Sequence, residues 1–187
     1  MKLKSRLAIG LLGAALALSA QAGSTVTDPN LPRSLPADGP VDVSWSDPAK
    51  FSDLRSGNRW EAERGDWVHQ LAQYARERAT KQLAPGEKLD IAITDIQRAG
   101  RYEPWLGPQF QNVRIIRDHY PPRLSLTYTL YGADGQVLAR NERKLSDAGF
   151  LMGSTPLNQT DPLRYEKRMI DDWVRRDLGP QRLVGSR

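Results

Sequence analysis

The clearest hydrophobic pattern in the chain is a strict alternation of apolar and polar side chains over residues 123–131. Leucines and Tyr128 alternate there with serine, threonine and Tyr131, which predicts a strand with one apolar face and one hydroxyl-rich face. Turn residues at positions 132–135 follow, and then a weaker alternation over residues 136–145. The pattern predicts a β-hairpin with one buried face, which a helix or another sheet has to cover.

Apolar residues at helical spacing predict two helices, one over residues 60–83 and one over residues 162–178. The apolar stripe of the first helix consists of Val68, Leu71, Ala72, Ala75 and Ala79. The stripe of the second consists of Leu163, Ile170, Trp173, Val174 and Leu178. Asp161 suits the N-cap of the second helix, and Pro162 suits its first position. Since each helix has one apolar face, both are expected to pack on the apolar face of the sheet.

Further alternating runs predict strands over residues 41–45, 88–97 and 113–117. In chain order the predicted elements are strand, helix, strand, short strand, hairpin and helix. This order predicts a single α+β domain over residues 41–180, in which a mainly antiparallel sheet of four to five strands carries two packed helices. Residues 181–187 are expected to fray after the last helix.

The first 22 residues have the organisation of a secretory signal peptide. Basic residues lead into an apolar run over residues 7–20, and the small residues of Ala20-Gln21-Ala22 suit the cleavage positions. The run has about 14 residues, whereas a helix needs about 20 to cross a bilayer, which argues against the alternative, an uncleaved anchor. We expect cleavage after Ala22 and a location in the periplasm, or release outside the cell.

Composition narrows the possible chemistry. The formal net charge is +5, but three basic residues lie in the first 22 residues, and the remainder has 24 basic and 22 acidic residues. A nearly neutral domain gives no strong field to attract a polyanion, so nucleic acid is not expected as a partner. The chain has no cysteine, which excludes disulfides, thiol chemistry, a lipid at the cleavage point and cysteine-based metal sites.

Residues 23–40 are rich in proline. The four prolines, which stand among small and polar residues, are Pro29, Pro32, Pro36 and Pro40. Such a segment has too little apolar surface to offset the entropy of ordering, which predicts an extended, poorly ordered linker before the domain. A motif that binds a partner is the alternative interpretation of the same composition.

No catalytic motif stands out. No serine lies in a G-x-S-x-G elbow, and the chain has two histidines, His69 and His119. His69 lies beside the apolar stripe of the first helix, which favours a packing role. His119 could form a hydrolytic or metal site with carboxylates, but the spacing of these residues does not support one. The carboxylates considered are Asp95, Asp118 and Glu166. We therefore predict no catalytic residue, no metal and no cofactor, with a hydrolase acting on an envelope substrate as the alternative.

The feature that points to binding is a loop of about 15 residues, 98–112, which is long for a compact domain. The candidate binding residues are Arg98, Arg101, Tyr102 and Trp105. Their rings and guanidinium groups would form an aromatic patch with polar edges for a protein, peptide or glycan partner. The alternative is that the aromatics pack under the sheet and only hold the loop in place. The first hypothesis is therefore a non-catalytic binding or interaction module of the cell envelope, with its oligomeric state open.

Several runs of the sequence also carry a resemblance to a known family. The main runs are Thr94-Asp95-Ile96 through Glu103-Pro104-Trp105, then Pro122-Arg123-Leu124-Ser125-Leu126-Thr127-Tyr128-Thr129-Leu130, then Leu163-Arg164-Tyr165-Glu166-Lys167-Arg168-Met169-Ile170-Asp171-Asp172-Trp173. Leu145-Ser146-Asp147 followed by Phe150-Leu151-Met152, and the early Asp47-Pro48, fit the same pattern. In this order the runs resemble the uncharacterised bacterial domain-of-unknown-function family numbered 3016 over residues 41–178. The resemblance implies an exported protein, but no activity and no catalytic residue, because none is established for that family.

Overall fold

The computed structural model describes residues 24–152 and 160–179, which form helices, strands and short 3-10 helices. The strands are β1 (Val41–Trp45), β2 (Lys88–Gln97), β3 (Arg101–Tyr102), β4 (Arg114–Ile115), β5 (Arg123–Tyr131) and β6 (Val137–Ser146). The α-helices are α1 (Arg59–Glu63), α2 (Trp67–Thr80) and α3 (Arg164–Asp177). The 3-10 helices are η1 (Pro48–Lys50), η2 (Ser52–Arg55), η3 (Pro104–Leu106) and η4 (Pro108–Phe110). The predicted signal peptide and C-terminal tail lie outside the described residues. Among the helices of the described residues, none has the length and hydropathy to span a membrane.

Four strands form the main sheet in the order β1-β2-β5-β6. β1 and β2 are parallel, whereas the other two pairings are antiparallel. The predicted hairpin is confirmed as β5 and β6, and Gly135 in its turn has a φ of 79°. Such a positive φ strains any residue with a Cβ, which explains the glycine at this position. The predicted single α+β domain with a mainly antiparallel sheet is confirmed.

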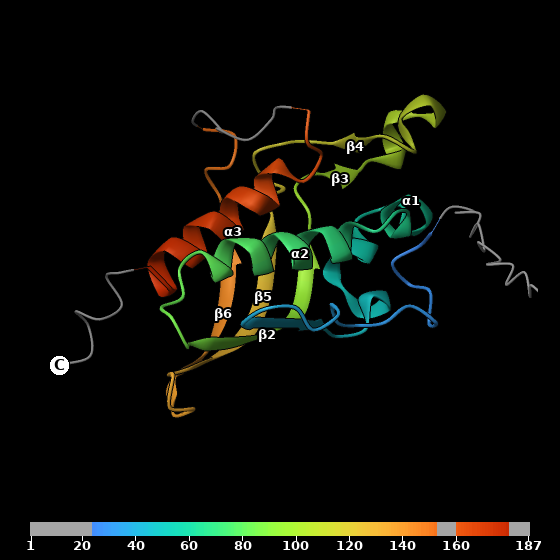
Figure 1. Ribbon diagram of the computed structural model, residues 1–187. Helices are drawn as coiled ribbons and strands as arrows, with labels where there is room; N and C mark the ends of the chain where they lie inside the picture. Colours follow the sequence, from blue (N-terminus) through green and yellow to red (C-terminus); the bar gives the residue numbers. More distant parts are fainter. Residues whose placement is uncertain (1–23, 153–159, 180–187) are drawn as a thin grey trace, which may run out of the picture.

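Helices α2 and α3 lie side by side across one face of the main sheet (Figure 1). Alternate residues of β5 are buried on this face, while Thr127 is exposed on the opposite face. α3 buries Trp173 completely, and its ring centroid lies 5.8 Å from that of Tyr128. The Tyr74 hydroxyl of α2 donates a hydrogen bond to Asp171 of α3 at 2.9 Å, which joins the two helices. The predicted helical stripes therefore form the core between the helices and the sheet.

Two predicted helix boundaries and the placement of one predicted strand are wrong. The helix predicted over residues 60–83 is two helices, because Gly65 has a φ of 86° and interrupts the helical backbone between α1 and α2. The last helix begins at Arg164 with Leu163 at the N-cap, not at Pro162 with Asp161 at the N-cap. Asp161 instead accepts a hydrogen bond from the Leu163 N–H at 2.8 Å, which closes a turn before the helix. The short strand predicted over residues 113–117 is β4, which is shorter and lies outside the main sheet because it pairs with β3.

Residues 24–40 pack against the domain, in contrast to the flexible linker predicted from their prolines. Val26 and Leu35 are buried in the core. The Leu35 N–H donates to a carbonyl of β1, and the Trp45 N–H of β1 donates to the Arg33 carbonyl, both at 2.9 Å. The segment therefore covers the outer edge of β1. With β1 and the start of α2 it also lines a cavity of about 300 Å³.

Candidate functional site

A small lobe projects from the main sheet and contains the loop in which the sequence places the binding residues (Figure 1). The lobe comprises residues 101–116, in which β3 and β4 form a two-stranded sheet and η3 and η4 lie between them. Pro104 and Pro108 each begin a 3-10 turn, where the fixed φ of proline suits the first position. Gly107 has a φ of 108°, a conformation that residues with a Cβ avoid, so it connects the two turns.

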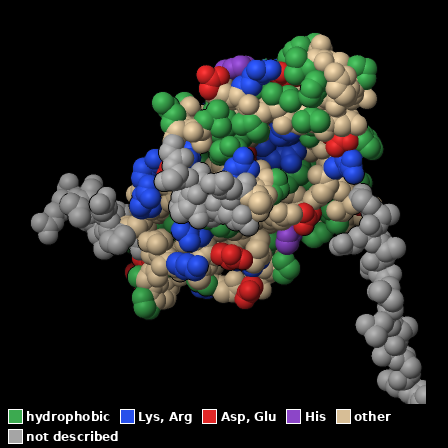
Figure 2. Space-filling view, turned by 90° about the horizontal axis from the view of Figure 1, so that it is seen from above, with side chains coloured by type: hydrophobic (Ala, Val, Ile, Leu, Met, Phe, Trp, Pro, Cys, Tyr) green, Lys and Arg blue, Asp and Glu red, His purple; other side chains and the backbone are tan. Residues whose placement is uncertain are grey.

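The surface of the lobe is rich in exposed hydrophobic side chains. Trp105 is 66% exposed and Phe110 is 40% exposed. Eleven large hydrophobic residues are exposed in the described part of the chain, and five lie in the lobe: Trp105, Leu106, Phe110, Val113 and Ile116. Figure 2 shows hydrophobic side chains gathered at the end of the molecule that carries the lobe. A cluster of this kind, unlike single scattered hydrophobic residues, is typical of an interaction surface.

A further exposed tryptophan adjoins the lobe. Trp60 of α1 is 61% exposed, and the Arg64 guanidinium lies 5.0 Å from the centroid of its ring. The side-chain amide of Asn58, directly before α1, donates to the Gln111 carbonyl at 2.9 Å. This hydrogen bond attaches the start of α1 to the lobe, so α1 contributes an exposed aromatic ring beside it.

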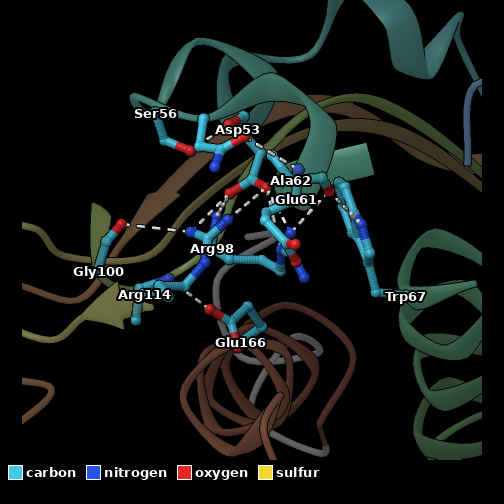
Figure 3. Close-up of polar contacts among 11 residues, drawn as sticks. Asp53, Ser56, Glu61, Ala62, Trp67, Arg98, Gly100, Arg114 and Glu166 are labelled. Atoms are coloured by element: carbon cyan, nitrogen blue, oxygen red, sulfur yellow. Dashed lines mark hydrogen bonds and ion pairs between the residues drawn. The ribbon is translucent and has the colours of Figure 1, made fainter. Parts of the chain in front are cut away.

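A buried cluster of charged residues fixes the base of the lobe (Figure 3). Asp53 of η2 is fully buried, and its Oδ2 accepts hydrogen bonds from Arg98 Nε and Nη2 at 3.0 and 2.8 Å. The same oxygen accepts a hydrogen bond from Arg114 Nη2 of β4 at 2.9 Å. The other carboxylate oxygen accepts the backbone N–H of Arg98 at 2.8 Å. Since both oxygens are occupied by protein donors, the cluster acts as a structural clamp on the lobe.

Aromatic rings reinforce this clamp. The Arg98 guanidinium lies 4.2 Å from the ring centroid of Trp67 at the start of α2. The Arg114 guanidinium lies 4.8 Å from the ring centroid of Tyr102 in β3. Cation–π contacts of this kind are strongest where the ring and the cation are shielded from water. Gly57 lies so close to β3 that a Cβ there would overlap the Tyr102 carbonyl oxygen. The base of the lobe is therefore packed tightly on the segment from η2 to α2.

A second buried carboxylate connects the two strands of the lobe. Glu103 is 2% exposed and accepts hydrogen bonds from Arg117 Nε and Nη2 at 2.9 and 2.7 Å. The Tyr120 hydroxyl donates to the same carboxylate at 2.9 Å. The hydrogen bonds from Arg117 hold the pKa of the Glu103 carboxyl below its ordinary value and keep it ionised. Because Glu103 follows β3 and Arg117 follows β4, this ion pair ties the two ends of the lobe together.

The four predicted binding residues all lie in or next to the lobe, in two different environments. Arg98 and Tyr102 belong to the base, where Arg98 binds Asp53 and Tyr102 is 6% exposed. Arg101 and Trp105 are exposed on the surface of the lobe. Each of the two interpretations of the loop therefore describes part of it: some side chains pack as anchors, and others face solvent.

Sequence reasoning missed the residues that make the lobe a rigid unit. Asp53 is separated from Arg98 by 45 residues and from Arg114 by 61 residues in the chain. No local pattern links residues so far apart. Phe110 has a recognisable signal, because, like Trp105, it is an aromatic residue within two positions after a proline in the same long loop.

The residues considered for a hydrolytic or metal site do not form one cluster. His119 and Asp118 are exposed and contact each other at 2.9 Å. Asp95 accepts hydrogen bonds from the backbone N–H and the hydroxyl of Ser52, both at 2.7 Å. His69 is exposed on α2. Within residues 24–152 and 160–179, no group of three or more His, Cys, Asp or Glu side chains could hold a metal ion.

Glu166 of α3 is a buried carboxyl beside the base of the lobe (Figure 3). Its Oε1 accepts the Ala99 N–H at 2.6 Å, while its Oε2 has no hydrogen-bond partner among the described residues. Burial raises the pKa of the Glu166 carboxyl above its ordinary value of 4.5. α3 is thus attached to the end of β2 through a carboxyl whose neutral form the interior favours.

Replacing Glu166 by glutamine should change how stability depends on pH. With a raised pKa in the folded state, the carboxyl contributes stability that is complete below its ordinary pKa of 4.5 and is lost as the pH rises through the folded-state pKa. Urea unfolding of wild type and Glu166→Gln at a series of pH values should therefore show wild type losing stability relative to the variant as the pH rises to neutral. A difference that stays constant over this range would contradict the raised pKa.

Comparison with known proteins gives a family match. Residues 39–176 match the model of a family described as "Protein of unknown function (DUF3016)". The matched residues include the main sheet, the lobe and nearly all of α3. No curated protein and no solved structure matches the chain.

Proposed function

Since the chain belongs to the DUF3016 family, whose function is unknown, we propose its function from its own surface: it is a non-catalytic binding module of the cell envelope, and the lobe is its binding surface. The observation that carries this proposal is the cluster of exposed hydrophobic side chains on the lobe. Aromatic side chains that become desolvated at the centre of an interface supply much of the binding free energy in many complexes.

The rigidity of the lobe supports the same proposal. Buried ion pairs hold both of its strands, one through Asp53 and one through Glu103. A surface that is already ordered loses less conformational entropy when a partner binds. Trp105 and Phe110 are thus presented to solvent by a framework that does not need to rearrange. No observation in the described residues favours the alternative hydrolase.

Replacing the two aromatic residues of the lobe tests the proposal. We expect the double change Trp105→Ala and Phe110→Ala to reduce capture of partners from an envelope extract by about tenfold or more. The variant should keep its stability to within about 1 kcal/mol, because both side chains are substantially exposed. Tyr102 is not included, since it is buried and its loss would also destabilise the base of the lobe.

The matched control for this experiment changes exposed hydrophobic residues elsewhere. Leu151 and Met152 are 46% and 83% exposed and lie outside the lobe. The double change Leu151→Ala and Met152→Ala should leave capture unchanged. Equal capture by wild type and both variants would sink the proposal that the lobe is the binding surface.

The location in the envelope is part of the proposal and has its own test. The supporting observation is the order of basic, apolar and small residues in the first 22 positions. We expect mass spectrometry of the protein recovered from a periplasmic extract to give a chain that begins at Gly23. Recovery of the full-length chain from the membrane fraction would contradict export with cleavage.

A further inference from the structure

The tip of the lobe, residues 104–113, contains no charged side chain. Charged residues make up 26% of the chain, so a surface segment of ten residues without one is a departure from the rest of the molecule. Its exposed hydrophobic members are Trp105, Leu106, Phe110 and Val113. Burying this tip in a partner therefore carries no free-energy cost for desolvating a charged group.

Most of the backbone N–H groups of the tip donate hydrogen bonds within its own turns. Pro104 and Pro108 have no N–H, so the ten residues of the tip carry eight N–H groups. Five of these donate to carbonyls of the tip or of Glu103, from Leu106, Gly107, Phe110, Gln111 and Val113. A protein partner would offer hydrogen-bonding groups of its own, whereas a lipid interior offers none. A tip with most of its N–H groups paired internally suits the boundary between headgroups and acyl chains, where the remaining N–H groups of Trp105, Gln109 and Asn112 can reach water.

The base of the lobe and its surroundings have an excess of positive charge. Residues 98–117 contain four arginines and one acidic residue, Glu103, and the adjoining residues 50–64 contain four basic and three acidic residues. Asp118 follows residues 98–117 and Asp95 accepts hydrogen bonds from Ser52, so both acids reduce the excess, whereas burial raises the pKa of the Glu166 carboxyl and favours its neutral form. Arg101 is exposed and forms no ion pair within the described residues. A basic group behind an uncharged tip with exposed apolar side chains complements a surface of anionic headgroups.

We infer that the lobe binds reversibly to anionic phospholipid membranes by inserting its tip, with Trp105 and Phe110 at the boundary between headgroups and acyl chains. Tryptophan is favoured at this depth because its ring is apolar and its N–H can reach water. Arg101, the arginine of the lobe that is exposed and not engaged by Asp53 or Glu103, then lies among the headgroups. The inference rests on the proposed function of the lobe and names the class of its partner.

Cosedimentation with lipid vesicles tests this inference. The protein is purified after export and its N-terminus is checked by mass spectrometry, so that the apolar residues 7–20 do not contribute to binding. Vesicles of phosphatidylethanolamine with phosphatidylglycerol should bind wild type, and vesicles of phosphatidylcholine alone should bind it less. Binding should weaken as salt is raised, because the ions screen the arginines.

Three variants separate the tip from the rest of the surface. Trp105→Ala with Phe110→Ala should reduce binding to the anionic vesicles by about tenfold or more, while Leu151→Ala with Met152→Ala should bind like wild type. Trp105→Phe should still bind, but without the blue shift of tryptophan fluorescence that insertion of the Trp105 ring gives to wild type.

Two results would overturn the inference. One is that wild type does not bind the anionic vesicles, and the other is that the tip variant and wild type bind them equally. Wild type could fail to bind vesicles and still capture an envelope protein that the tip variant does not capture. In that case the lipid inference is wrong, and the proposed function of the lobe still holds. If the tip variant binds vesicles and captures proteins as well as wild type does, both the lipid inference and the proposed function of the lobe are wrong.

Discussion

Replacing Asp53 by alanine is expected to destabilise the protein by about 3–5 kcal/mol, because it removes one partner from a buried ion cluster. Asp53 is fully buried, while the side chains of Arg98 and Arg114 are only 15% and 16% exposed. Without the carboxylate, two guanidinium groups would stay next to each other without their counter-charge. Urea unfolding measures the loss of stability, and hydrogen exchange of the lobe should become faster because its base is no longer clamped.

The matched control for Asp53 is a partly exposed carboxylate, 35% exposed, with an exposed arginine partner. Asp172 pairs with Arg175 at 2.6 Å, and the Arg175 side chain is 74% exposed. Asp172→Ala should cost less than about 1 kcal/mol, since exposed ion pairs contribute little. Losses of similar size for the two variants would show that the cluster at the base of the lobe is no more important than a surface ion pair.

Replacing Trp173 by alanine should cost about 3–5 kcal/mol, because it removes the largest fully buried side chain of α3 and leaves a cavity. Trp173 packs against the ring of Tyr128 in β5, and its indole N–H donates to Asp177 at 3.2 Å. The same loss should appear in thermal and in urea unfolding, since α3 and the sheet share one core.

Trp105→Ala is the comparison for Trp173→Ala, since it removes the same side chain from an exposed position. Trp105 is 66% exposed, and its loss should cost less than about 1 kcal/mol. A small loss for Trp173→Ala would mean that α3 does not pack on the sheet. A large loss for Trp105→Ala would mean that the tip of the lobe is part of the core.

The secondary structure of the main sheet and of α3 could be predicted because the signal lies in neighbouring residues. Alternation along β5 and the stripe that contains Trp173 each report which face is buried. The break between α1 and α2 depends on the backbone at Gly65, and a glycine in a sequence is compatible with both a continuous and a broken helix. Because the sequence does not distinguish these two cases, the predicted helix over residues 60–83 continues through Gly65.

The lobe could be predicted only in part. The length and the aromatic content of the loop pointed to it, and Trp105 is exposed as a binding residue has to be. The roles of Arg98 and Tyr102 depend on Asp53 and Arg114, which the fold brings to them from distant parts of the chain. Such contacts are a property of the tertiary structure and leave no periodic pattern in the sequence.

Proline content was a poor guide to residues 24–40, because an extended segment can pack as well as a regular strand. The segment uses its extended backbone to donate and accept hydrogen bonds along β1, and its apolar residues Val26 and Leu35 reach the core. Low hydrophobicity predicts disorder only when a segment has no neighbour to pair with. Here the neighbour is a strand that follows it directly in the chain.

The packing of residues 24–40 along β1 affects how the molecule behaves in concentrated solution. The two outer strands of the main sheet are protected against strand-to-strand aggregation in different ways. β6 exposes the charged side chains of Arg140, Glu142 and Lys144, which disfavour pairing with a strand of a second molecule. β1 has instead the chain segment around Leu35 bonded along it. A shortened protein that began at Val41 would keep its core strands, but would present the bare backbone of β1 as a template for pairing between molecules.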